Sequence, residues 1–292
     1  MISVLDKDRV FLDYGPIEMM LMATSPDKNM TAQMQEAAKE AMTWLSQLSQ
    51  VLDQAKDVRT LSYPRPHELP LPLRRMVEAV LATGDRSLTP MAAVAGTFSD
   101  LVADRLVEDG AHKVIINNGG DIAIRLFGSE RTKVGITPSI GAKRFTHVIK
   151  LSSSSGVGGV ATSGRGGRSF TKGIASSATV LAQSARVADS CATLIANHCF
   201  TPDPHILQLP AEELDPQTDI PGHYVTVKVG ELSPEVKSKA LENALAKAND
   251  LFSQGIIQGA VVFLDEFVGM IPNDLCYPVI KKEEVKNGNG NS

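Results

Sequence analysis

Residues 159–199, GVATSGRGGRSFTKGIASSATVLAQSARVADSCATLIANHC, hold the residue types best suited to binding chemistry. A loop rich in Gly, Ser and Thr leads into the short apolar strand SATVLA, and a helix of small residues follows. The loop offers backbone N–H groups with little side-chain bulk around them, which suits an anion. Loop and helix together predict a site for a phosphate-bearing ligand and a hard cation.

The predicted helix carries Asp189 and Thr193, four residues apart and therefore on one face. Mg²⁺ prefers oxygen ligands and takes one or two carboxylates together with carbonyl groups and ligand phosphates, so this pair suits it. Two alternatives stay open: Asp189 could cap or pair locally, and Thr193 could bond back to the carbonyl of residue 189. His198, on the same helix, fits either a general base or an imidazole that interacts with the helix C-terminus.

The loop itself has the composition of a phosphate-binding loop. Thr162-Ser163-Gly164 is followed by Gly166-Gly167, although the patterns GxxxxGK[ST] and GxGxxG are absent. Arg165, Arg168 and Lys172 add positive charge, which suits a phosphate or a carboxylate. A solvated loop without a ligand is the alternative.

Two other segments could border such a site. Thr89 is a good helix N-cap and Pro90 suits the first helical position of a helix that ends at Gly110. The first turns of this helix hold almost only small residues, so another backbone or a ligand can approach them closely: Ala92, Ala93, Ala95 and Gly96. The turn NNGGD at 117–121 separates two predicted strands, and it fits an ordinary hairpin as well as a polar site.

The remaining elements must position these segments. Apolar spacing predicts helices over 30–56, 73–83 and 234–254, and a proline-rich connector over 61–72. Besides SATVLA, strands are expected in six places: two within 9–23, one over 114–116, one over 122–127, two within 133–151, one over 223–229 and one or two over 256–271. Because helices alternate with paired strands, we expect an α+β fold with a mixed or antiparallel sheet.

Composition limits the class of protein. The 292 residues are 43% hydrophobic and 21% charged, as in ordinary globular proteins, and the net charge of −4 provides no basic surface for nucleic acid. No apolar run is long enough for a membrane helix, and the N-terminus lacks the apolar core of a signal peptide, so we expect a cytoplasmic protein without a membrane partner. We expect one domain over residues 1–280, or two intertwined subdomains, and a disordered tail over 281–292.

Four motifs, taken in order, are similar to the ApbE-like superfamily: TPMAAVAGTFSD, INNGGDI, VATSGRGGRS and TVLAQSARVADSCATLIAN. Characterised members of that superfamily are Mg²⁺-dependent FAD:protein FMN transferases. The chain most resembles a poorly characterised branch with GPMAAVAG, ENGGDI, TSSG and ADSxAT motifs. The resemblance covers about residues 85–200 and implies tandem T-fold-like subdomains around a flavin site.

The resemblance also implies site residues and cofactors. The metal ligands for Mg²⁺ would be the backbone carbonyl of Ala92 and the side chains of Asp189 and Thr193. FAD or FMN, or another small-molecule or nucleotide ligand, would contact a larger set: Thr89, Gly96, Asn118, Gly119, Gly120, Asp121, Thr162, Ser163, Gly164 and Arg168.

The chain departs from the transferases in ways that bear on activity. Transferases carry Asp where Thr89 stands and Lys where Ala95 stands, and RSFTKGIAS replaces their H-x-x-D-P-x-T-G segment. Losing these groups argues against the standard FMN transfer, although an enzyme of this family would catalyse flavinyl or nucleotidyl transfer with Mg²⁺. Two alternatives remain: a ligand-free structural protein of this fold, or a non-flavin protein of sulfur or homocysteine metabolism. Candidate thiols for the latter are Cys191 and Cys199, which otherwise fit small buried hydrophobic residues. The sequence leaves a homo-oligomer open.

Overall fold

The computed structural model describes residues 1–279, so the tail expected over 281–292 lies outside the described residues. Its central feature is a nine-stranded sheet in which every strand pairs antiparallel with its neighbours. The strand order is β1 (Ile2–Asp6), β2 (Arg9–Tyr14), β3 (Ile17–Thr24), β4 (Lys113–Asn118), β5 (Asp121–Leu126), β8 (Gly159–Ser163), β9 (Ser177–Ala182), β12 (Ile257–Leu264) and β13 (Phe267–Ile271).

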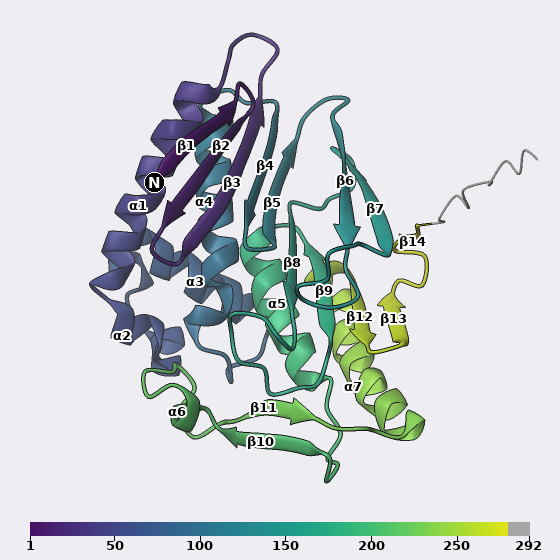
Figure 1. Cartoon of the computed structure of the whole chain (residues 1–292). Coiled ribbons are helices and arrows are strands. Elements are labelled where there is room, and N and C mark those ends of the chain that lie inside the picture. The colour runs from purple at the N-terminus through teal and green to yellow at the C-terminus, as the bar shows by residue number, and fades with distance from the viewer. Residues whose placement is uncertain (280–292) are drawn as a thin grey trace, which may run out of the picture.

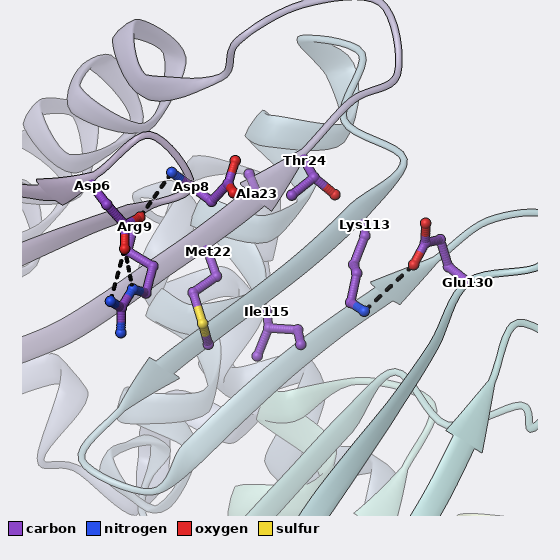
Figure 2. A pocket seen from close by; sticks show the side chains of 9 residues that line it. All are labelled: Asp6, Asp8, Arg9, Met22, Ala23, Thr24, Lys113, Ile115 and Glu130. Carbon is purple, nitrogen blue, oxygen red and sulfur yellow. Dashed lines mark hydrogen bonds and ion pairs between the residues drawn. The ribbon is translucent and has the colours of Figure 1, made fainter.

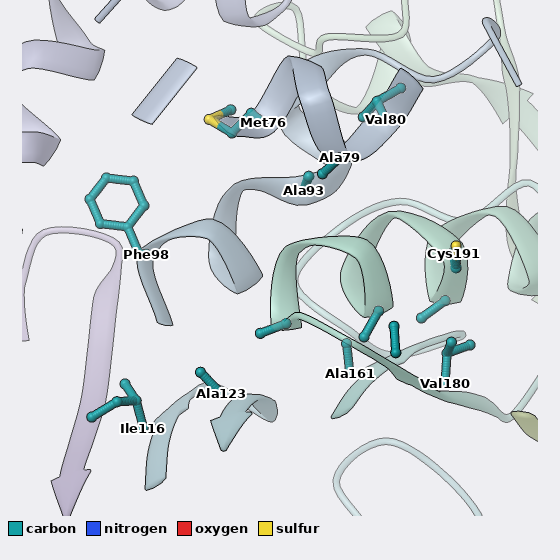
Figure 3. Packing of buried hydrophobic residues seen from close by; sticks show 14 of the residues in the cluster. Met76, Ala79, Val80, Ala93, Phe98, Ile116, Ala123, Ala161, Val180 and Cys191 are labelled. Atoms are coloured by element: carbon teal, nitrogen blue, oxygen red, sulfur yellow. The ribbon is translucent and has the colours of Figure 1, made fainter. Parts of the chain in front are cut away.

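Helices cover one face of this sheet (Figure 1). The covering helices are α1 (Thr31–Ser49), α3 (Leu71–Ala82), α4 (Val94–Glu108), α5 (Ala185–His198) and α7 (Pro234–Ser253). Shorter turns connect them: α2 (Leu52–Ala55), η1 (Val58–Ser62), η2 (Pro66–Glu68), η3 (Pro90–Ala93) and α6 (Ala211–Leu214). The main core fills the space between helices and sheet, where Met76 and Phe98 of the helices pack in one buried cluster with Ile116 and Val180 of the strands (Figure 3).

Two smaller sheets complete the fold. β6 (Arg131–Ile136), β7 (His147–Ser152) and β14 (Tyr277–Pro278) form one of them, which packs on the opposite face of the main sheet. A second core lies between them and includes Ile136, Ile149, Val160 and Phe263. The hairpin of β10 (Ile206–Pro210) and β11 (Tyr224–Val229) lies beyond the C-terminal end of α5 (Figure 1).

The α+β architecture with antiparallel sheets confirms the expected fold class. Several local expectations were wrong. Residues 159–163 belong to an inner strand of the main sheet, not to a loop, because their backbone pairs with β5 and β9. β1 and β10 were not expected at all, and the helix expected over 30–56 is interrupted after Ser49.

The helix after Thr89 also differs from expectation. Its first turn is the 3₁₀-helix η3, and α4 begins only at Val94. The Thr89 side chain does not cap this turn, since its hydroxyl instead donates to Oδ2 of Asp219. Thr89 is therefore tied to a distant segment of the chain. Among residues 1–279, no helix has the length and apolar content needed to cross a membrane.

A surface cavity of about 430 Å³ lies at the end of β3 and the start of β4 (Figure 2). Met22 and Ile115 are among its lining residues, as are the ion pairs Asp6–Arg9 and Lys113–Glu130. The NNGGD turn is at the opposite end of β4. This cavity is therefore separate from the residues that the sequence singles out.

Candidate functional site

The position of α5 is set by a carboxylate from α4. Asp100 is fully buried and accepts hydrogen bonds from the backbone N–H groups of Ala185 and Arg186, over 3.1 and 3.0 Å. Its charge is balanced by the guanidinium groups of Arg186 and Arg125, at 3.0 and 2.9 Å. Ser184, the N-cap residue, makes no side-chain cap bond. Asp100 of the neighbouring helix α4 caps the first turn of α5 instead.

Close backbone contacts hold the same turn. A Cβ on Gly96 would lie 2.3 Å from the carbonyl oxygen of Ala185, and a Cβ on Gly159 would lie 2.1 Å from the Ala185 nitrogen. Ala185 therefore sits between α4 and β8 at distances that only glycine permits on both sides. The small residues of α4 serve helix packing, one of the two roles that composition left open.

This packing brings Asp189 against α4. Oδ2 of Asp189 accepts a hydrogen bond from the backbone N–H of Gly96 over 2.9 Å, so its partner is in another helix and not local. Asp121 lies close enough for its charge to act on Asp189. Burial, and then the charge of Asp121, raise the pKa of Asp189 well above its ordinary value. Two carboxylates therefore share one half-buried region.

Asp121 begins β5 and faces the helices, since side chains alternate along a strand and Ala123 belongs to the main core. Burial raises the pKa of Asp121 to about 7, while the Arg168 charge and the backbone N–H of Thr162 lower it. The main-chain carbonyl of Asp121 accepts from Ser99 of α4 over 2.8 Å. Asp121, Asp189, Gly96 and Arg168, all expected in the site, are thus neighbours.

The NNGGD segment is a two-residue hairpin turn, with Asn118 paired to Asp121 and positive φ at Gly119 and Gly120. The Gly120 N–H is already bonded to the Asn117 side chain over 2.9 Å. A Cβ on Gly119 would lie 2.3 Å from the Arg168 guanidinium, so this guanidinium rests on the turn. The segment is therefore an ordinary hairpin turn, as one of the two alternatives predicted. It also places Asp121 next to Arg168.

Asn118 faces the helices from the end of β4. Its side-chain nitrogen donates to the carbonyl of Ala95 over 3.3 Å. Its Oδ1 atom is buried and has no hydrogen-bond partner within the described residues. This buried oxygen can accept a hydrogen bond from a water or a ligand that lies next to the carboxylates.

The loop residues contribute unequally. The Thr162 hydroxyl bonds to Thr179 over 2.8 Å, so Thr162 offers the site its backbone and not its side chain. Ser163 is on the helix-facing side of β8, and Gly164 is buried where the chain leaves the strand. Arg165 turns away to Asp265, 3.0 Å distant, whereas Arg168 stays exposed beside the turn.

The expected metal ligands lie on two elements that pack against each other. Asp189 and Thr193 are half-buried on one face of α5, and Ala92 is half-buried in η3, which packs on α5. Within the described part of the chain, no three His, Cys, Asp or Glu side chains gather as a metal-binding group. A cation here would depend on two carboxylates, a hydroxyl, a carbonyl and ligand oxygens, which suits Mg²⁺.

Sequence reasoning missed residues that reach this region from later segments. Asp219 binds Thr89, and Nδ1 of His223 lies 3.2 Å from Nζ of Lys172. The backbone of Lys172 is bound to Asn197, which lies one turn beyond Thr193 on α5. Nothing in local spacing signals these contacts, because 51 to 130 residues separate Asp219 and His223 from their partners.

The cysteines and His198 take no part in this arrangement. Cys191 and Cys199 are fully buried, and burial raises the pKa of each thiol to about 12. They are buried hydrophobic residues, as their type suggested. His198 Nδ1 bonds to the carbonyl of Leu194 over 2.9 Å, so this imidazole serves the C-terminal end of the helix.

Sequence comparison finds relatives named UPF0280 proteins. That of Methanococcus vannielii is 34% identical over 163 residues, which cover 52% of this chain and 64% of that protein. The chain thus spans just under two thirds of that relative's length. The UPF0280 protein of Methanococcus maripaludis strain C6 is 30% identical over 186 residues, covering 61% of this chain and 74% of that protein.

Two solved structures are similar at low identity. The ApbE protein from Thermotoga maritima aligns with a TM-score of 0.49 and 13% identity, covering 92% of this chain and 96% of that one. The flavin transferase ApbE from Vibrio cholerae aligns with a TM-score of 0.40 and 13% identity, covering 64% and 85%.

A family model extends over almost the whole described chain. The family is described as AbpE bacteria, and its model matches residues 2–273, from β1 to the end of β13. This range includes all four motifs that resemble the ApbE-like superfamily. The protein therefore belongs to this ApbE-like family.

Proposed function

We propose that this protein binds a phosphate-bearing anion, of the nucleotide class, together with Mg²⁺ at the region between α4, α5 and the NNGGD turn. The observation that carries the proposal is the pair Asp121 and Asp189, two half-buried carboxylates that repel each other on the helix side of the sheet. A divalent cation would relieve that repulsion, because it neutralises both charges. Arg168, exposed beside Asp121, is placed to meet the anion.

The residues present fit a hard cation. Asp189, Asp121, Thr193 and the Ala92 carbonyl would hold it, and the unpartnered Asn118 Oδ1 would accept from a bound water or from the ligand. When bound, Mg²⁺ would neutralise phosphate charge and orient the ligand. The backbone N–H groups of Gly96 and Ala95 hold the Asp189 carboxylate in place.

The ligand within this class is part of the same proposal. FMN and FAD are the first candidates, because characterised members of the ApbE-like superfamily are FAD:protein FMN transferases. ADP tests whether the diphosphate group alone is sufficient for binding. A flavinyl or nucleotidyl transfer is the reaction we would look for, in a cytoplasmic protein. A thiol-based function in sulfur or homocysteine metabolism has no support from the structure, because Cys191 and Cys199 are buried and protonated.

Calorimetric titration with ADP, FMN and FAD, each with and without Mg²⁺, tests the binding. We expect Mg²⁺ to strengthen nucleotide affinity about tenfold or more, which corresponds to one good charge-assisted contact. Asp189→Asn should remove this effect of Mg²⁺ and leave the fold intact, as judged by circular dichroism. If none of the three nucleotides binds with or without Mg²⁺, the protein is a ligand-free member of its family.

Transfer is tested separately. The protein is incubated with FAD, Mg²⁺ and acceptor peptides, and the mass of each peptide and the release of AMP are followed. An added FMN mass that depends on Asp189 would establish transfer. Nucleotide binding without any product would limit the protein to binding.

A further inference from the structure

A second polar cluster lies at the C-terminal end of α5. Nζ of Lys172, in the loop before β9, lies 3.2 Å from Nδ1 of His223, which directly precedes β11. Since lysine is only a donor, Nδ1 accepts this hydrogen bond and the imidazole is neutral with its proton on Nε2. Asp219, which accepts from Thr89, attracts both groups from farther away.

Three elements fix the backbone of Lys172. Its N–H donates to the Asn197 side chain of α5 over 2.9 Å. Its carbonyl accepts from Gln208 of β10 over 2.8 Å and from the Thr226 hydroxyl of β11 over 3.3 Å. The backbone of Lys172 is thus fixed and its ammonium contacts His223 over 3.2 Å, whereas an ordinary surface lysine is mobile.

The electrostatics of the pair favour an anion. Burial lowers the pKa of Lys172, and burial together with the Lys172 charge lowers the pKa of His223. Asp85 and Asp219 raise the pKa of Lys172, and Asp219 and Glu212 raise that of His223, but burial outweighs them. Positive charge is therefore disfavoured here despite these carboxylates. A phosphate or carboxylate that binds the Lys172 ammonium and the Nε2–H group of His223 would supply a close counter-charge and accept from both.

The pair is aligned with the carboxylates of the proposed site. Asp189, Thr193 and Asn197 follow one another at four-residue steps and form a half-buried polar stripe on α5. Eight residues of helix separate Asp189 from Asn197, which is about 12 Å at 1.5 Å per residue. Lys172 lies at the end of the stripe, because its backbone binds Asn197.

We propose that Lys172 and His223 form an anion subsite at the far end of the α5 stripe, and that the ligand extends from there along the stripe to Asp121 and Asp189. The subsite takes a phosphate or carboxylate group. The second half of this inference rests on the proposed function. It identifies the ligand as extended, with acidic groups at two separated points, as in a dinucleotide or a nucleotide with a second acidic group.

Titration of ADP, FAD and inorganic phosphate into the whole protein, followed by calorimetry and by NMR of the histidine imidazoles, tests the subsite. In the wild type, phosphate alone should shift the His223 imidazole signal. Lys172→Met should abolish this shift and weaken FAD affinity about tenfold or more, and Lys172→Arg should restore most of it. Lys113→Met, which removes a lysine of the Lys113–Glu130 pair at the distant cavity, is the matched control and should change neither.

The outcomes separate this inference from the proposed function. If Asp189→Asn removes the effect of Mg²⁺ while phosphate still moves the His223 signal, both sites exist. If Mg²⁺ has no effect on nucleotide binding but the His223 signal moves and depends on Lys172, the subsite stands without the metal site. If saturating phosphate and FAD leave the His223 signal unmoved, or if Lys172→Met binds both as the wild type does, the subsite is overturned. His223→Gln gives a second test, because His223 is exposed and its replacement does not disturb the core.

Discussion

The backbone N–H of Gly96 donates to Oδ2 of Asp189 over 2.9 Å, and so links the first turn of α4 to the middle of α5. This bond can form because the two helices approach at Gly96, where a Cβ would lie 2.3 Å from the Ala185 carbonyl oxygen. The position of the Asp189 carboxylate therefore depends on a helix contact one turn away.

Gly96→Ala should disturb both the fold and the site. The added methyl group would collide with backbone and not with a flexible side chain, so α4 and α5 must separate. We expect a loss of about 1–3 kcal/mol in the free energy of unfolding, typical of overpacking, together with loss of Mg²⁺-dependent nucleotide affinity. Urea denaturation and calorimetry measure the two effects.

Gly167→Ala is the control for that change. Gly167 is exposed, and the atom nearest an added Cβ belongs to the flexible Ile140 side chain at 3.2 Å. This variant should keep wild-type stability within about 0.5 kcal/mol. Equal losses in the two variants would contradict the role given to the α4–α5 contact.

Asp100→Asn should destabilise the protein by about 3 kcal/mol or more, because it leaves Arg125 and Arg186 without their buried counter-charge. Asp104→Asn removes a second carboxylate from Arg125, but the Asp104 side chain is 51% exposed. That change should cost less than about 1 kcal/mol. The urea midpoints of both variants measure these losses of stability. Similar losses in the two variants would show that Asp100 does not anchor α5.

Local patterns predicted the parts of the site that lie within one element. Asp189 and Thr193 share a face because helical spacing requires it, and the NNGGD turn is a hairpin because Gly119 and Gly120 accept positive φ. The main helices and most strands follow from apolar spacing in the same way.

Contacts between distant segments could not be predicted. Residues 159–163 are rich in small and polar residues, and only pairing with β5 and β9 makes them a strand. Thr89 looks like an N-cap, yet the better partner for its hydroxyl is Asp219, 130 residues later. The role of Asp100 as the cap of α5 depends on two helices meeting, which no local spacing encodes.

The thiols should be inert in the folded protein. Burial raises the pKa values of Cys191 and Cys199 to about 12, so at pH 8 roughly one thiol in 10⁴ would be ionised. We expect a thiol-specific disulfide reagent to label neither residue within hours in buffer and to label both at once in urea. Fast labelling of either cysteine in the native state, located by peptide mass, would reopen a thiol-based function.

The last prediction concerns pH. Burial raises the pKa of Asp121 from 3.8 to about 7, so the folded state holds a proton that the unfolded state releases. The contribution of this group to stability is therefore complete below about pH 4 and is lost as pH rises through about 7. In buffer without divalent metal, Asp121→Asn should gain stability relative to the wild type between pH 5 and 8, by at least about 1.4 kcal/mol, the equivalent of one pKa unit.

Urea denaturation of both proteins at several pH values measures this difference and cancels the titrating groups that do not interact with Asp121. The difference includes a part from Asp189, because the Asp121 charge raises the pKa of Asp189. Mg²⁺ should then stabilise the wild type more at pH 8 than at pH 5, because ionised carboxylates bind the metal. Asp121→Asn should lose most of that gain. A wild type whose stability relative to Asp121→Asn stays constant from pH 5 to 8 would mean that Asp121 does not titrate in this range, which contradicts a pKa of about 7.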